Sequence, residues 1–245
     1  MGSKNKKQSV MDHLSELRKR LMIIAVVTLL STLLCYQFVD KIVQLILNLN
    51  QGVNLVYIAP AELFIVYIKL AITFGIVLSS PITLTQIWIF ISKGLFKKEK
   101  IYIVISLIFG IVFFIGGVLF CYSVVLPITL SFFVNITVPG IEAMISVDSF
   151  VSFISTMLLC FGVVFEMPIV IFLLSLIGIV KPETLLKNQK IFILIIFVVS
   201  AFITPPDLVS QTFLAIPMVL LFELSIGISF LVKKKKNKKS QKATE

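Results

Sequence analysis

The stretch DSFVSFISTMLLCFGVVFEMPIVIFLLSLIGIVK, residues 148–181, decides the fold of this chain. It is long and apolar enough to cross a bilayer, whose hydrocarbon core needs about 20 residues of helix. One carboxylic acid, Glu166, lies near its middle. A charge at that depth costs on the order of 3 kcal/mol, so an intramembrane glutamate indicates a functional site. Pro168 is expected to weaken or kink the helix next to this carboxyl group.

Further apolar segments lie on both sides of this one. With 58% apolar residues and a mean hydropathy of +1.09, the chain is predicted to be an all-α integral membrane protein. We predict a transmembrane domain over residues 21–232. An amphipathic segment lying on the cytoplasmic membrane surface precedes it (1–20), and a basic tail expected to be disordered follows it (233–245). The six predicted spans are 21–38, 61–91, 101–126, 150–179, 191–204 and 210–232.

The fifth and sixth spans are expected to be short. Residues 191–204 reach only about 21 Å as a helix, against a hydrocarbon core of about 30 Å. In the sixth span, Gln211 and Glu223 bracket a short apolar stretch that Pro217 interrupts. We hypothesise that these two helices thin the membrane locally or lie behind longer helices.

The basic residues indicate how the spans are oriented. Lysine and arginine are retained on the cytoplasmic side of a membrane. The chain has 22 such residues, and all except Lys41 and Lys69 lie either before the first span or directly after the second, fourth or sixth span. These positions are all on the same side of the membrane. Both termini are therefore predicted to be cytoplasmic. The net charge of +10 follows from this topology and from the tail, so we expect anionic lipid as a neighbour and no nucleic acid.

Glu166 has two interpretations. It is either held by an internal polar residue, such as Lys69, Thr85 or Gln86, or it is a functional group. In the second case it is a docking point for a partner's transmembrane helix or a proton-binding site.

The other acidic residues also have simple structural explanations. Glu16 is spaced to pair with Arg20 one helical turn later, and Glu99 lies among lysines. On the external side, Asp148 is placed to favour the N-terminus of the fourth span, and Asp207 or Ser210 to cap the sixth.

No motif indicates an enzyme. The chain has one histidine and lacks zinc-protease, nucleophile-elbow and phosphate-loop motifs. Cys35, Cys121 and Cys160 lie in apolar segments without metal-ligand spacing. We expect no catalytic residue, no cofactor and no metal.

Four motifs in order resemble the TatC family, the polytopic component of the twin-arginine protein translocase of bacterial cytoplasmic membranes. They are HLSELRKR (13–20), QIWIF (86–90), FGVVFEMP (161–168) and TPPD with the following SQT and LAIP (204–217). The resemblance covers nearly the whole chain except the lysine tail. It implies a glove-like bundle of six helices with short fifth and sixth spans.

The resemblance also implies a function. It implies a receptor for the arginine pair in the signal peptides of folded cargo, with export driven by the proton-motive force. Glu16 and Glu99 would accept the signal arginines, with Arg18 and Phe90 in the same binding site. The remaining implied contacts are those of Glu166 and Gln211 with single-span partners of the TatA or TatB type in a multimeric complex.

Two other classes of protein make different predictions. A proton-coupled transporter of small solutes would use Glu166 as its proton carrier and would show inverted internal repeats, and the sequence shows none. A membrane scaffold would tolerate replacement of Glu16 and Glu99 without loss of function.

Overall fold

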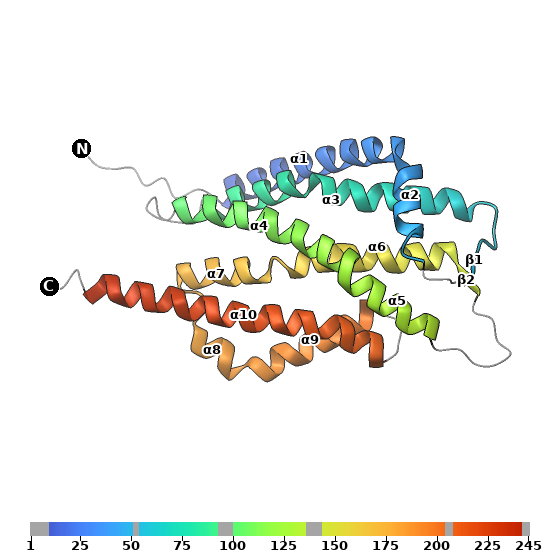
Figure 1. The fold of residues 1–245 in the computed structure, drawn as a ribbon. Coiled ribbons are helices and arrows are strands. Elements are labelled where there is room, and N and C mark those ends of the chain that lie inside the picture. The colour runs from blue at the N-terminus through green and yellow to red at the C-terminus, as the bar shows by residue number, and fades with distance from the viewer. Residues whose placement is uncertain (1–9, 51–53, 93–99, 136–143, 204–207, 242–245) are drawn as a thin grey trace.

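The computed structural model describes residues 10–50, 54–92, 100–135, 144–203 and 208–241. Its long helices run lengthwise in one bundle, with the start of α1 (Val10–Gln37) and the end of α10 (Leu208–Gln241) at the same end (Figure 1). Among the described residues, five helical segments are long and apolar enough to span a membrane, and one apolar helix is shorter. The first and last described residues therefore lie at one end of the bundle, as the placement of the lysines and arginines predicts.

The first half of the chain forms three crossings. Its elements are α1 (Val10–Gln37), α2 (Val39–Leu47), β1 (Asn54–Val56), α3 (Glu62–Ser92), α4 (Lys100–Phe120), a π-helical turn (Cys121–Val125) and α5 (Leu126–Asn135). Because α1 shows no break at residue 20, the segment predicted to lie on the membrane surface belongs to the same helix as the first span. The third crossing is longer than predicted, since α5 continues it beyond residue 126.

The helix α3 contains Pro81, yet it runs unbroken past this residue. A proline has no N–H to donate to the carbonyl group four residues earlier. Here the hydroxyl of Ser80 donates to that carbonyl, on Val77, at 2.7 Å. The side chain therefore satisfies the acceptor that the proline leaves.

The fourth crossing lies at the centre of the bundle. It consists of α6 (Val147–Val164) and α7 (Met167–Ile177), separated at Phe165 and Glu166. This interruption confirms the break predicted next to Pro168. Half of the most apolar part of this crossing is buried within the chain, and its large side chains, such as Phe161, form the core against α3 and α4.

The last crossings are formed by α9 (Gln189–Ile203), which follows the short α8 (Pro182–Lys187), and by α10 (Leu208–Gln241). The fifteen residues of α9 make it short, as predicted. The prediction of a short sixth span is wrong, because a long apolar part of α10 runs from Gln211 to Lys234. Glu223 does not end it, since its carboxylate accepts a hydrogen bond from the amide of Gln189. The helix also continues through the basic tail, expected to be disordered, as far as Gln241.

A small sheet joins two connections at the end of the bundle that is predicted to be external. Strand β1 pairs in parallel with β2 (Met144–Ser146), with Asn54 opposite Met144 and Val56 opposite Ser146. The all-α prediction missed these strands, which are three residues each and too short to show a periodic pattern.

Candidate functional site

Glu166 lies in a cavity inside the membrane-spanning part of the bundle. The cavity has a volume of about 500 Å³ and is lined by side chains of α1, α3, α4, α6 and α7. Glu166 is only 8% exposed, and neither of its carboxylate oxygens has a hydrogen-bond partner among the described residues. Most of the lining is apolar, with hydroxyls from Thr28, Ser79 and Thr83. A buried carboxyl group without a donor is costly, so this cavity is a place where a further donor would be stabilising.

The indole of Trp88 shares the neighbourhood of Glu166. Its Nε1 is also buried and has no partner within the described part of the chain. Both groups lie over Gly110 of α4. A Cβ atom placed on that glycine would lie 3.1 Å from Oε2 of Glu166 and 3.4 Å from Nε1 of Trp88. The missing side chain at Gly110 therefore makes the room that the two polar groups occupy.

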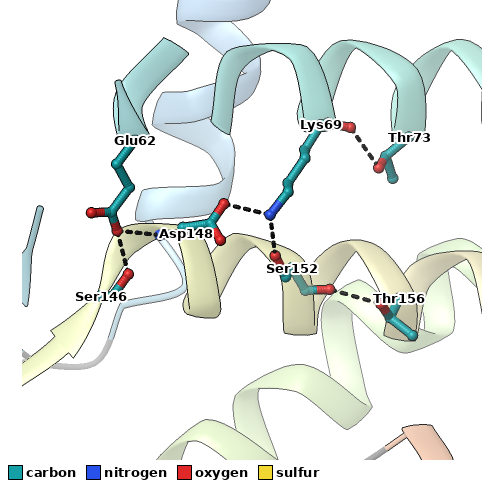
Figure 2. Close-up of polar contacts among 7 residues, drawn as sticks. All are labelled: Glu62, Lys69, Thr73, Ser146, Asp148, Ser152 and Thr156. Carbon is teal, nitrogen blue, oxygen red and sulfur yellow. Dashed lines mark hydrogen bonds and ion pairs between the residues drawn. The ribbon is translucent and has the colours of Figure 1, made fainter. Parts of the chain in front are cut away.

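The internal contacts proposed for Glu166 are wrong. Lys69 instead binds Asp148 on the external side, the hydroxyl of Thr85 donates to the carbonyl of Pro81, and the side chain of Gln86 accepts from Arg20. The sequence places Lys69 in the second span and Glu166 near the middle of the fourth, but it does not show how the two helices are offset when they pack. The structure puts Lys69 at the external end of α3, level with the start of α6 (Figure 2).

The end of the bundle that is predicted to be cytoplasmic carries a charged cluster. As the spacing predicts, Arg20 pairs with Glu16: its Nη2 and Nε donate to one carboxylate oxygen, Oε1, at 2.6 and 2.9 Å. Its Nη1 donates to Oε1 of Gln86 on α3, at 2.9 Å. The guanidinium thus joins α1 to α3. Glu16 therefore already binds a guanidinium, through two donors that converge on one of its oxygens.

The other residues assigned to signal-peptide binding are placed as follows. Arg18 is exposed on α1, and Phe90 is half-buried near the cytoplasmic end of α3. Glu99 lies outside the described residues. The structure thus brings Glu16 and the end of α3 together through Gln86.

Two further carboxylates organise the external end (Figure 2). Asp148, in the first turn of α6 as predicted, binds the ammonium of Lys69 at 2.5 Å, and Ser152 accepts from the same ammonium at 2.9 Å. Glu62, which the sequence analysis did not single out, accepts from the hydroxyl of Ser146 and from the backbone N–H of Asp148 at 3.1 Å. Its other oxygen accepts from the backbone N–H groups of residues 58 and 59 at 2.7 and 3.3 Å. This end is a network that ties the external connections to α3 and α6.

The remaining predicted contacts lie near the start of α10. The amide of Gln211 donates to the backbone carbonyl of Phe197 at 2.8 Å, so it links α10 to α9. Asp207 lies outside the described residues.

Two functional neighbours escaped the sequence analysis. Trp88 is the only tryptophan of the chain, and its place in a motif next to Gln86 was noted without a role. Gly110 has no side chain that could indicate a role. Its importance is seen only from the close approach of Glu166 and Trp88 that it permits. The periodicity of α3 alone does not show which of its residues face Glu166, because that depends on the packing of α3 against α6 and α4.

Comparison with known proteins places these features in one family. Residues 12–217 match the family model described as Sec-independent protein translocase protein (TatC). A protein of that name from Desulforapulum autotrophicum is 35% identical, over 100% of this chain and 93% of its own length. Its counterpart in Escherichia coli K12 is 38% identical, over 94% of this chain and 92% of its own. A crystal structure of the twin-arginine translocase receptor TatC is similar with a TM-score of 0.81 and 35% identity, over 90% of this chain and 99% of that one.

Proposed function

Because the chain belongs to the TatC family of Sec-independent protein translocase proteins, we propose that it is the receptor that binds twin-arginine signal peptides of folded cargo. It is a multi-pass membrane transport protein and not an enzyme. In the proposed function both termini lie in the cytoplasm of a bacterium, the signal peptide approaches from that side, and the proton-motive force drives export.

The contact between Glu16 and a guanidinium carries this proposal. Two N–H groups of Arg20 make charge-assisted hydrogen bonds to one oxygen of Glu16, so this carboxylate already binds a guanidinium. The same carboxylate is thus suited to bind an arginine from another chain. Glu99 is proposed as the second acceptor, with Arg18 and Phe90 beside the bound peptide.

Glu166 is proposed as the docking point for a partner helix. A carboxyl group that finds no donor within the described chain gains most from a helix that brings one, and the cavity gives it room. The proposed partners are single-span proteins of the TatA type, and of the TatB type where one exists, assembled into a multimeric complex. Gln211 is proposed as a second contact near the external end.

The receptor role is tested by photo-crosslinking in membranes. A twin-arginine signal peptide and its twin-lysine counterpart are compared on the unmodified protein and on the variants Glu16→Ala and Glu99→Ala. Crosslinking that is selective for arginine, and that either substitution removes, is the expected result. Equal labelling by both peptides that the substitutions leave unchanged would exclude the receptor role and favour a solute transporter.

The docking role is tested with the fluorescence of Trp88, the single tryptophan, which lines the same cavity as Glu166. A tryptophan-free peptide with the sequence of the partner's transmembrane helix is added to the protein in bilayer discs. We expect a saturable spectral shift that Glu166→Ala abolishes and Glu166→Gln, which still offers hydrogen bonds, partly preserves. A shift of equal size in Glu166→Ala would show that the helix docks elsewhere.

A further inference from the structure

The ion pair between Glu16 and Arg20 is more enclosed than an ordinary surface pair. The side chains of Arg20 and Glu16 are only 15% and 13% exposed. Both donors of Arg20 that face Glu16 go to the same oxygen, and the third nitrogen of the guanidinium is held by Gln86, 66 positions further along the chain. The arginine is therefore fixed from two helices, and not only by its neighbour one turn away.

We propose that Arg20 is an internal ligand of the signal-peptide site, which an incoming arginine must displace from Glu16, and that Gln86 sets how firmly it is held. This inference rests on the proposed receptor function. A carboxylate that is 13% exposed and bound to one guanidinium offers a second one little access until the first moves. When Arg20 moves away from Glu16 it loses the contact with Gln86 as well, and because Gln86 belongs to α3, that contact can be removed without changing Glu16 or its helix.

The internal ligand acts as a threshold on binding. The apparent affinity for any ligand of Glu16 falls by the fraction of molecules in which Arg20 is already displaced. That fraction is the same for every peptide, so it lowers the affinity for arginine and lysine peptides by one factor. Their ratio is set separately, by the two parallel donors that a guanidinium offers and an ammonium does not. With Arg20 in place, the affinity for a twin-lysine peptide, which is already the lower of the two, becomes too low for stable binding of a signal peptide.

Loosening the arginine should therefore tighten peptide binding. Gln86→Met removes the hydrogen bond to Arg20, keeps the side-chain length and leaves Glu16 untouched. Arg20→Lys keeps the charge and removes the fork. A hydrogen bond to a charged group corresponds to about tenfold or more in an equilibrium, so we expect Gln86→Met to bind both signal peptides about tenfold more tightly, with an unchanged ratio. Arg20→Lys should act in the same direction.

The experiment measures dissociation constants by fluorescence anisotropy, with labelled twin-arginine and twin-lysine peptides and the full chain in bilayer discs. Thr85→Val is the control for Gln86→Met, because Thr85 is its neighbour on α3 and its hydroxyl donates within that helix, to the carbonyl of Pro81. Lys19→Arg is the control for Arg20→Lys. Both controls should bind as the unmodified protein does, and matching thermal unfolding curves establish that each variant is folded.

The two proposals fail in different ways. If Glu16→Ala still binds the twin-arginine peptide selectively, the receptor role of Glu16 is wrong, and the internal ligand with it. If Glu16→Ala abolishes binding while Gln86→Met and Arg20→Lys bind no more tightly than the unmodified protein, the receptor role stands and Arg20 does not compete with the peptide. Weaker binding by both variants would also overturn the inference, because Arg20 would then be helping to hold the peptide.

Discussion

The helices α1 and α3 pack against each other along much of their length (Figure 1). Replacing Gly75 of α3 by alanine is predicted to push the two helices apart. A Cβ atom on Gly75 would lie 2.4 Å from Oγ1, 2.7 Å from Cα and 2.8 Å from N of Thr32 on α1. Non-bonded heavy atoms normally lie about 3.5–4.0 Å apart, so the two backbones must move apart by roughly 1 Å. Overpacking of this kind typically costs about 1–3 kcal/mol, and we expect a loss of about 2 kcal/mol in the free energy of unfolding.

The assay is equilibrium unfolding in mixed detergent micelles, followed by circular dichroism. Gly116→Ala is the matched control, because a Cβ atom there meets nothing within 4 Å and the substitution favours helix by up to about 1 kcal/mol. The double variant Gly75→Ala with Thr32→Ala removes the closest atom, Oγ1, but leaves the clashes with Cα and N. It should therefore recover only part of the loss.

Two results would refute this reasoning. If Gly75→Ala were as stable as Gly116→Ala, the helices would not be in backbone contact at this point. Full recovery in the double variant would mean that the hydroxyl of Thr32, and not the backbone, limits the approach of the helices.

Three further outcomes follow from the polar groups of the bundle. Gly110→Ala brings a methyl group to 3.1 Å from a carboxylate oxygen of Glu166, which lies at the end of a flexible side chain, so the free energy of unfolding should change by less than about 1 kcal/mol. Binding of the partner helix, read from tryptophan fluorescence, should weaken. Unaffected binding would contradict the docking role. A double-mutant cycle of Lys69→Met and Asp148→Asn should give a coupling free energy below about 1 kcal/mol, because the two side chains are 36% and 34% exposed to solvent. A coupling free energy of several kcal/mol would show that the ion pair is less solvated than this exposure indicates. Glu62→Gln replaces one acceptor oxygen by a donor, so it should cost about 1–3 kcal/mol and speed hydrogen exchange in the two external strands; unchanged exchange would mean that the strands hold without it.

The apolar helices that cross the bundle were predictable because each depends on properties of a single segment. Apolar length identifies a crossing, and the placement of lysine and arginine gives its direction. The pairing of Glu16 with Arg20 was predictable for the same reason, since one helical turn fixes their spacing. Each of these follows without knowing how one helix packs against another.

The features that the sequence did not reveal depend on contacts between helices. Glu223 suggested an early end to the sixth span, because the amide of Gln189 that satisfies it comes from α9. The partner proposed for Glu166 was wrong for a related reason: a lysine on a neighbouring span is a reasonable partner until the depths of the two residues are known. The third interaction of Arg20, with Gln86, likewise requires the packing of α1 on α3.

The carboxylates of the described spans differ in one respect that bears on function. Glu16, Glu62, Asp148 and Glu223 each accept hydrogen bonds from donors that the chain itself provides. Glu166 is buried near the centre of the bundle, where an unmet acceptor costs most, and it has no donor among the described residues. The fold supplies donors to four acidic groups, and some of these donors come from distant parts of the chain, as Gln189 does for Glu223. Such a fold is able to satisfy a fifth acidic group. That it leaves Glu166 facing a cavity instead is the physical reason to expect the missing donor from another molecule.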